Sequence, residues 1–276
     1  MTATTSVASE LGLNVDDAIV LQNANRLAVR LVPCDVLARI ATTVRRNQEA
    51  AAFELEMARR LAETNSPVEV PEPRVQPLVY VRDGFAVTYW TYYEPQSGEV
   101  PPDEYAGALE RLHAGMRRLD VAAPHFTDRV EEAHSIVRDS SRSPELGDAD
   151  RELLSNALQG LRQAILDRGA DEQLLHGEPH AVNLLKTASG LRFIDLETCC
   201  YGPVEFDLAH APDEVSDHYA NGDRLLLRDC RILVLAMVAA WRADRDDQFP
   251  NGREILAAFL GLVREGLGRH GSYVGR

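Results

Sequence analysis

The chain has 276 residues, of which 45% are hydrophobic and 26% are charged, a balance typical of a globular protein. That length is near the size at which a single hydrophobic core gives way to two domains. The formal net charge of -14 argues against sequence-independent binding of nucleic acid, which depends on Lys and Arg neutralising phosphates. It favours a small cationic partner, unless the acidity only keeps the protein soluble.

The apolar pattern indicates neither secretion nor membrane insertion. Residues 1–10 are small and polar and lack the apolar segment of a signal peptide. The most apolar run, residues 232–241, is far shorter than the ~20 residues of a membrane-spanning helix. The four cysteines show no metal-ligand spacing, so we expect free thiols in a reducing cytoplasm. Because the apolar runs are too short to span a bilayer, we expect no membrane partner.

The N-terminal third predicts an antiparallel meander followed by a helix. Three β-prone runs follow a polar leader, at residues 18–21, 26–32 and 35–41. The period then changes, because residues 47–64 are rich in helix formers and carry Phe53, Met57 and Leu61 four positions apart.

Two more strands complete this part of the chain. After a proline-rich loop at residues 66–73, we predict strands at 76–81 and 85–93. Asp83 and Gly84 between them form a good hairpin turn. A connector rich in Pro, Gly and Ser begins at Glu94, so we place a boundary there, between residues 1–94 and 95–276.

Beyond this boundary the pattern is mainly helical. We predict helices at residues 103–119, 127–138, 148–168, 223–243 and 253–270. Short β segments are expected near 174–176, 183–185 and 191–194. The fold class is therefore α+β, with a small sheet-containing lobe before a larger helical one.

The polar residues that could be catalytic or bind a metal concentrate in one stretch, residues 175–210. Its sequence is LHGEPHAVNLLKTASGLRFIDLETCCYGPVEFDLAH. Gly177 and Pro179 prevent His176 and His180 from sharing a helix turn, as the histidines of a zinc protease do. A zinc-dependent hydrolase is thus the remotest reading.

A carboxylate and two oxygen ligands remain in this stretch. Glu178 is followed five positions later by Asn183, and then by Asp195 after a short hairpin. Such oxygen ligands suit Mg²⁺, which prefers one or two carboxylates together with waters and substrate phosphates.

These motifs resemble a known superfamily. HGExHxxN, FIDLE and GPxxFDLA are similar to the HGDxHxxN, IDxE/D and GDPxxDLA series of the aminoglycoside phosphotransferase and choline kinase superfamily, which has the protein-kinase fold. The upstream meander, helix and two strands also match its smaller lobe. The resemblance makes residues 1–94 the nucleotide-binding lobe and residues 95–276 the catalytic and acceptor-binding lobe.

The resemblance implies a role for each matching residue. Glu178 would orient or deprotonate an acceptor hydroxyl. Asn183 and Asp195 would hold Mg²⁺ against the phosphates of ATP or GTP, with Glu197 a candidate further ligand. Asp207 would brace the backbone of the catalytic loop. The alternative for each is a solvated loop charge.

The histidines of the same motif, His176 and His180, would be structural, because a histidine beside a catalytic loop more often fixes backbone than transfers protons.

On the nucleotide side, the resemblance calls for a lysine on the third strand, paired with a glutamate on the next helix. The chain has one lysine, Lys186, and the matching position is Arg39, which would grip phosphate oxygens with its forked guanidinium. Its expected partner is Glu54, with Glu56 as second choice. Arg30 is an alternative to Arg39.

Two further features concern the nucleotide. The turn between the first two strands has no glycine-rich loop, only residues 22–25, QNAN. The base would lie against the end of the fifth strand, around Trp90, Thr91 and Tyr92. Those aromatic side chains could equally belong to the core of the strand.

The sequence departs from the family pattern at Glu178, where the family has aspartate. The extra methylene moves the carboxylate by roughly 1.5 Å, and a misplacement near 1 Å can lower a rate about a hundredfold. Since phosphoryl transfer relies chiefly on positioning and electrostatics, we place an enzyme ahead of a catalytically impaired, nucleotide-binding regulatory protein.

The acceptor is predicted to be a small, cationic, hydroxyl-bearing molecule such as an aminoglycoside. Acidic clusters in the C-terminal part would attract its ammonium groups: Asp213, Glu214, Asp217, Asp244, Asp246 and Asp247. The alternative is that these carboxylates are solvated helix ends. Monomer and homodimer remain open.

Overall fold

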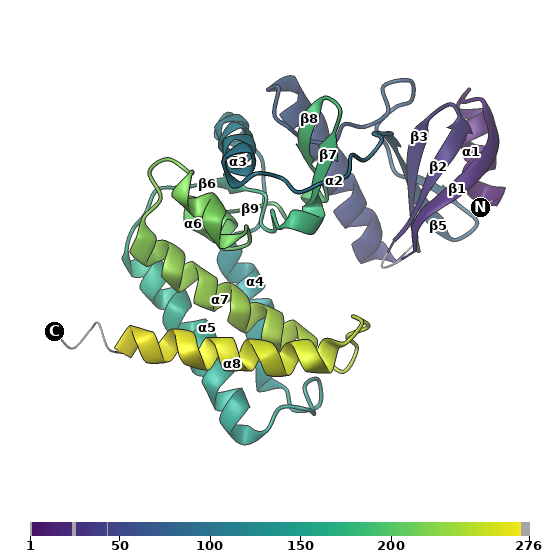
Figure 1. Ribbon diagram of the computed structural model, residues 1–276. Helices are drawn as coiled ribbons and strands as arrows, with labels where there is room; N and C mark the ends of the chain where they lie inside the picture. The colour runs from purple at the N-terminus through teal and green to yellow at the C-terminus, as the bar shows by residue number, and fades with distance from the viewer. Residues whose placement is uncertain (1, 24–25, 43, 272–276) are drawn as a thin grey trace. The chain divides into compact units, whose positions relative to one another are not determined.

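The computed structural model describes residues 2–23, 26–42 and 44–271. The chain divides into two compact units, each of which combines two separate segments (Figure 1). The first unit comprises Met1–Asp120 and Ala181–Thr198, and the second comprises Val121–His180 and Cys199–Arg276. This division differs from the boundary after residue 94, which described functional lobes and stays a prediction.

A five-stranded antiparallel sheet forms the β part of the first unit, in the order β1-β2-β3-β5-β4. Its strands are β1 (Val15–Asn23), β2 (Leu27–Pro33), β3 (Val36–Thr42), β4 (Tyr80–Arg82) and β5 (Phe85–Thr91). Alternate residues of β2 and β3, such as Val29, Leu31 and Ala38, are fully buried, as expected for a sheet with one face on a core. The predicted meander, helix and two-strand order is confirmed.

The β4–β5 hairpin turns at the predicted dipeptide. Asp83 and Gly84 have φ of 53° and 80°, the left-handed conformation that the turn requires. β4 begins four residues later than expected. Pro77 lies in the missing part and has no N–H to donate to a ladder.

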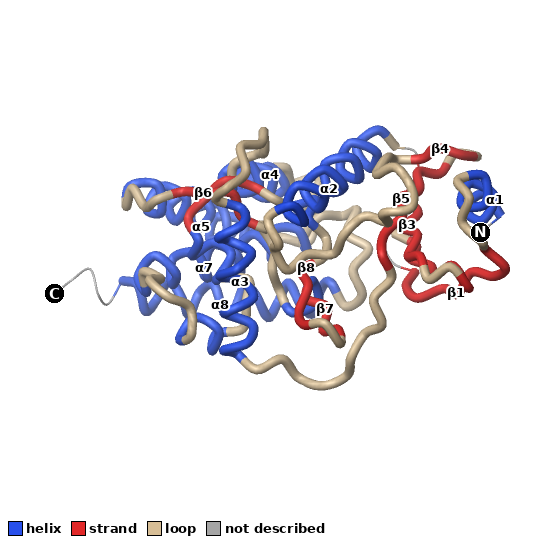
Figure 2. The backbone as a smooth tube through the Cα atoms, turned by 90° about the horizontal axis from the view of Figure 1, so that it is seen from above, coloured by secondary structure: helices blue, strands red, loops and turns tan. Residues whose placement is uncertain are grey.

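The first residues form a helix, α1 (Thr2–Glu10), where the sequence indicated only a polar leader. Val7 and Ala8 are buried in the core that β2 and β3 also line, and the Tyr89 hydroxyl donates to the Thr4 carbonyl at 3.0 Å. Figure 2 shows α1 beside β1 and β4. Thr and Ser are weak helix formers, so these tertiary contacts rather than local propensity stabilise α1.

The second helix, α2 (Arg45–Glu63), presents an apolar stripe to the interior of the first unit. Leu55, Met57 and Leu61 are buried on it. Glu54 is equally buried on the same helix, although it is charged. A buried carboxylate requires partners, which the site described below provides.

A β-hairpin from the later part of the chain completes the first unit. It consists of β7 (Leu184–Thr187) and β8 (Gly190–Phe193), and it lies with α3 (Pro102–Met116) in that unit. Phe193 packs edge-on against Tyr105 of α3, with ring centroids 6.1 Å apart. Phe193 also bridges to Val68 in the proline-rich loop. These long-range contacts explain why the hairpin belongs to the first unit.

Helices make up most of the second unit. They are α4 (Phe126–Arg138), α5 (Asp148–Asp167), α6 (Val204–Leu208), α7 (Arg224–Arg242) and α8 (Gly252–Gly271), accompanied by the pair β6 (Glu172–Leu175) and β9 (Cys200–Pro203). The apolar α7 packs against α4, α5 and α8. The five predicted long helices are confirmed, as α3 in the first unit and as α4, α5, α7 and α8 in the second. The elements α6 and β9 were too short to predict from periodicity.

Among the described residues, none of the helices combines the length and apolar character needed to cross a bilayer.

Candidate active site

A buried aspartate holds the loop that follows β6. The Asp207 carboxylate accepts the backbone N–H groups of His176 and Gly177 at 2.9 and 2.8 Å. Asp207 is fully buried, so these charge-assisted hydrogen bonds are shielded from water. Gly177 has a φ of 88°, which suits glycine. The prediction that Asp207 braces this loop through its backbone is confirmed.

Glu178, the next residue of the loop, forms an ion pair with Arg129 of α4 through its Oε1 and the arginine Nη2. The two side chains are only 21% and 15% exposed. Burial raises the pKa of the Glu178 carboxyl, but its interactions with Arg129 and, to a smaller extent, with the neighbouring His210 outweigh burial and lower that pKa overall. Arg129 had no signal in the sequence, because it lies 49 positions away.

Asn183 and Asp195 flank the open end of the β7–β8 hairpin. Leu184 pairs with Phe193, and the ladder continues through a 3.0 Å hydrogen bond from the Ile194 N–H to the Asn183 carbonyl. Asp195 follows directly and has a φ of 65°, in the left-handed region. The hairpin thus brings together Asn183 and Asp195, which are 12 positions apart in the sequence. Asn183 is buried, at 7% exposure.

Arg39 of β3 lies between two buried glutamates. It donates to Glu54 Oε1 at 2.7 Å and to Glu69 Oε2 at 2.6 Å. Burial lowers the pKa of Arg39, but Glu69, Glu54 and Asp195 outweigh it and raise that pKa. The pairing of Arg39 with Glu54 is therefore formed as predicted, and Glu56 instead pairs with Arg59 and Arg60 on the helix surface.

A second arginine extends this contact. Arg26, the residue before β2, pairs with Glu54 at 2.7 Å and also with Glu197. The result is an alternating chain that we call the arginine–glutamate network: Glu69, Arg39, Glu54, Arg26 and Glu197. Sequence reasoning missed Arg26, and it left Glu197 a candidate metal ligand, whereas here its carboxylate contacts an arginine.

Glu69 is the other member that the sequence did not reveal. It lies in the proline-rich loop and is 3% exposed. Burial raises its carboxyl pKa to about 7, even though Arg39 acts in the opposite direction. A carboxylate in a loop with no periodicity carries no sequence signal of burial.

Comparison with known proteins places the chain in a family. The family model described as "Phosphotransferase enzyme family" matches residues 21–250, well over half of the sequence. The chain belongs to the phosphotransferase enzyme family. No curated protein matches it in sequence.

Solved structures of several kinases and phosphotransferases share the fold at low sequence identity. Choline kinase LicA from Streptococcus pneumoniae is 16% identical, with a TM-score of 0.69 over 96% of this chain and 99% of that one. The amicoumacin kinase hAmiN in complex with AMP-PNP, Ca²⁺ and Ami is 14% identical, with a TM-score of 0.69 over 95% and 93%. A thermostable mutant of aminoglycoside phosphotransferase APH(4)-Ia is 12% identical, with a TM-score of 0.71 over 99% of both chains. The predicted kinase-like α+β fold is confirmed.

The hairpin residues fit a divalent cation of the kind that phosphotransferases use. Asn183 and Asp195 offer an amide oxygen and a carboxylate, the hard ligands that Mg²⁺ prefers. Within residues 2–23, 26–42 and 44–271, no group of three or more His, Cys, Asp or Glu side chains is arranged to hold a metal ion. Mg²⁺ is commonly held by one or two protein ligands of this kind together with waters and substrate phosphates.

The aromatic residues at the end of β5 divide between core and surface. Tyr89 and Trp90 are 2% and 1% exposed and belong to the core, and the Arg39 guanidinium lies 4.8 Å from the centre of the Trp90 ring. The N–H of Thr91 donates to the Val70 carbonyl at 3.0 Å. Tyr92 stacks under the Arg30 guanidinium at 4.1 Å. Contact of this segment with a base stays a prediction.

Arg30, the alternative to Arg39, points to other partners. Its guanidinium pairs with Asp35 and Glu94. It is thus not part of the arginine–glutamate network.

The acidic clusters of the second unit are largely paired with arginine. The pairs are Asp213 with Arg231, Asp217 with Arg224, Asp244 with Arg142, Asp246 with Arg245 and Asp247 with Arg242. Carboxylates that are engaged with guanidinium groups are poor traps for an ammonium group. Asp213, Asp217 and Asp246 are exposed, as the alternative of solvated helix ends requires, whereas Asp244 and Asp247 are each 13% exposed.

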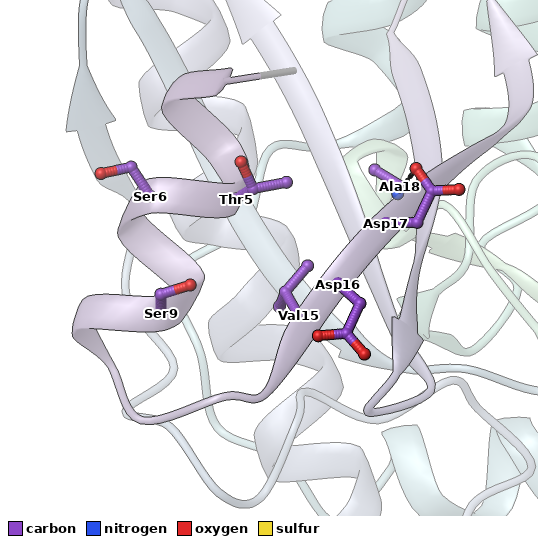
Figure 3. A pocket seen from close by; sticks show the side chains of 7 residues that line it. All are labelled: Thr5, Ser6, Ser9, Val15, Asp16, Asp17 and Ala18. Carbon is purple, nitrogen blue, oxygen red and sulfur yellow. Dashed lines mark hydrogen bonds between the residues drawn. The ribbon is translucent and has the colours of Figure 1, made fainter.

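A shallow hollow lies between α1 and β1 in the first unit (Figure 3). Its lining is Thr5, Ser6, Ser9, Val15, Asp16, Asp17 and Ala18. None of these residues belongs to the arginine–glutamate network or to the hairpin.

Proposed function

We propose that this protein is a small-molecule O-phosphotransferase that moves the γ-phosphoryl group of ATP or GTP onto a hydroxyl group. The acceptor class that we propose is an aminoglycoside or another small cationic molecule. The arrangement around Arg39 carries the proposal. Arg39 of β3, Glu54 of α2 and Asp195 belong to one compact unit. The two carboxylates lie close enough to Arg39 to raise the pKa of its guanidinium.

Arg39 would hold the α- and β-phosphates. Its guanidinium stays charged at every relevant pH and offers a fork of donors that matches phosphate oxygens. Glu54 fixes the direction of that fork, because its carboxylate accepts a hydrogen bond from one of the two terminal nitrogens at 2.7 Å. Arginine would thus do in this chain what lysine does in protein kinases.

Asn183 and Asp195 would hold Mg²⁺. When bound, the ion neutralises the charge that develops on the β- and γ-phosphate oxygens. The hydrogen bond from Ile194 to the Asn183 carbonyl fixes the backbone between the two ligands. The structure of hAmiN is a complex with AMP-PNP and Ca²⁺, which supports a nucleotide and a divalent cation as cofactors here.

Glu178 would orient the acceptor hydroxyl and accept its proton. The loose transition state of phosphoryl transfer asks little of a base, so an ionised carboxylate in a fixed position is sufficient. The brace by Asp207 fixes the backbone of this loop.

The cationic acceptor rests on the net charge of -14 and on relatives named for choline and aminoglycosides. The four free cysteines support a reducing, cytoplasmic location.

A turnover assay tests the proposal. Thermal shift with Mg²⁺ and ATP or GTP measures nucleotide binding, and ADP or GDP release is then followed with a panel of aminoglycosides, choline and simple amino alcohols. We expect acceptor-dependent release with at least one of them. Nucleotide binding without release on any acceptor contradicts the proposal and indicates a regulatory protein.

The variant Asp195→Asn links that turnover to the hairpin. It keeps the size of the side chain and tolerates the left-handed backbone, so the fold is preserved while the charge is lost. We expect kcat to fall at least about a hundredfold, the scale on which loss of an electrostatic group acts. Asp171→Asn, at an exposed position, is the matched control. Equal turnover of the two variants excludes the metal role.

A further inference from the structure

The ion pair between Arg129 and Glu178 lies wholly in the second unit and connects two elements that are distant in the sequence. Both side chains are largely buried, at 15% and 21% exposure. A guanidinium in such surroundings holds a carboxylate in place more strongly than a surface pair does, because water competes less for both charges.

Arg129 is itself fixed on two sides. It lies in the first turns of α4, which begins at a capping box made by His125 and Asp128. Its guanidinium carbon lies 5.2 Å from the centre of the Trp241 ring on α7, within the range of a cation–π contact. The arginine is thus oriented by α4 and α7, independently of the glutamate.

Arg129 is also the main source of positive charge around Glu178. The other titratable groups near the carboxylate are His180 on the same loop and His210 after α6, with Asp207 and Cys200 beside them. Burial lowers the pKa of His210 to about 4, so that this imidazole is neutral at pH 7.

The geometry points to a role that rests on the proposed function. We propose that Arg129 is a positioning residue for Glu178. The two side chains act as one unit, in which the guanidinium holds the Glu178 carboxylate in a single orientation. The glutamate side chain is longer by one methylene than the aspartate of the family. The arginine thereby compensates for the extra methylene. Arg129 donates to the Oε1 oxygen of that carboxylate.

A double-mutant cycle tests the proposal in the full-length chain, with Arg129→Gln, Glu178→Asp and the double variant. We expect Arg129→Gln to lower kcat about ten- to a hundredfold, in line with a misplacement near 1 Å, and to leave the nucleotide KM within about twofold. The shorter side chain of Glu178→Asp cannot reach Arg129 in the same way. In that background Arg129→Gln should therefore lower kcat by less than about threefold.

The pH profile separates positioning from a general effect on folding. Without Arg129 the pKa of Glu178 rises, so the acid limb of kcat should move to higher pH. Arg138→Gln, an exposed arginine on the same helix, is the control and should leave both kcat and its pH profile unchanged. Equal losses in the two backgrounds, or an acid limb that does not move, overturn the proposal.

Two measurements keep the outcome decisive. If Arg129→Gln does not fold, the cycle is repeated with Arg129→Lys, which keeps the charge but loses the planar fork. If the unmodified protein turns over no acceptor, the proposed function fails, and the pair is then judged by carboxyl NMR of ¹³C-labelled glutamate. In that titration an unchanged Glu178 pKa in the arginine variant overturns the role of Arg129.

Discussion

Two clusters of charged side chains, one in each unit, solve different electrostatic problems. The arginine–glutamate network of the first unit has three glutamates to two arginines, and Asp195 adds a further negative charge close to Arg39. The pair of Arg129 and Glu178 in the second unit is balanced, one charge against one.

The difference follows from what each cluster is proposed to bind. A surplus of carboxylates suits a region that accepts a divalent cation, because the ion supplies the positive charge that the two arginines do not. A balanced pair suits a side chain that only has to stay ionised and point in one direction. Both clusters rely on arginine, in a chain with a single lysine.

The largest effect is expected when the network loses Arg39, which lies between two buried glutamates. Arg39→Gln leaves Glu54 and Glu69 buried without that guanidinium, so the free energy of unfolding should fall by about 3–5 kcal/mol at pH 7. Urea denaturation measures it. Arg59→Gln on the exposed face of α2 is the control and should change stability by less than about 1 kcal/mol. Similar losses for both variants contradict a special role for the buried network.

The pH dependence of stability sharpens the same comparison. Because the folded-state pKa of Glu69 is raised to about 7 from an unfolded value of 4.5, the folded state holds the proton more tightly, and stability should fall as pH rises from about 4.5 to about 7. The shift corresponds to roughly 3 kcal/mol. Glu69→Gln should remove this decline, as measured by urea denaturation at pH 5 and pH 8.

An exposed carboxylate provides the contrast. The pKa of Glu56 is lowered to about 2 by hydrogen bonds from Arg59 and Arg60, so its contribution is lost only as pH falls toward 2. Glu56→Gln should leave the change between pH 5 and pH 8 as it is. If Glu69→Gln behaves in the same way, Glu69 is not the titrating group.

In the second unit, Asp207→Asn is expected to have an intermediate effect. The NH₂ group of asparagine would face one of the two backbone N–H groups that Asp207 now accepts. That buried N–H loses its acceptor, so the free energy of unfolding should fall by about 1–3 kcal/mol. The comparison is Asp223→Asn at the exposed N-cap of α7, where the aspartate also accepts two N–H groups. Since asparagine caps helices well, this second variant should change stability by a few tenths of a kcal/mol. Equal changes would show that burial of the brace is irrelevant.

The smallest effect is expected at the acidic clusters. Asp246→Asn removes an 83% exposed carboxylate that pairs with Arg245 at 3.8 Å, so stability should change by less than about 0.5 kcal/mol. The KM for a cationic acceptor should also stay within about twofold, since the carboxylate is not assigned to the acceptor. A large rise in that KM would restore the clusters as ammonium-binding groups.

Much of the fold could be predicted because its signals are local. The spacing of Met57 and Leu61 predicted α2, and the Asp83–Gly84 dipeptide predicted the β4–β5 turn. The failures are elements without such signals. α1 is built from Thr, Ser and Ala and depends on the burial of Val7 and Ala8.

The candidate site divides along the same line. The partnership of Arg39 with Glu54 and the brace by Asp207 were both predicted from the resemblance to the kinase-like superfamily. Arg26, Glu69 and Arg129 were missed, because their partners lie 28, 30 and 49 positions away in the chain. No periodicity or spacing connects residues at such separations.

The amino-acid sequence by itself determined the order of strands and helices, the family and the identity of the residues that carry the proposed chemistry. Those properties depend on turn chemistry, periodicity and short motifs, which neighbouring residues encode together. Only the tertiary structure decided which arginine meets which carboxylate, and which of those carboxylates are buried. The physical reason is that an ion pair depends on the distance and solvent exposure of two side chains, and folding sets both across long stretches of chain.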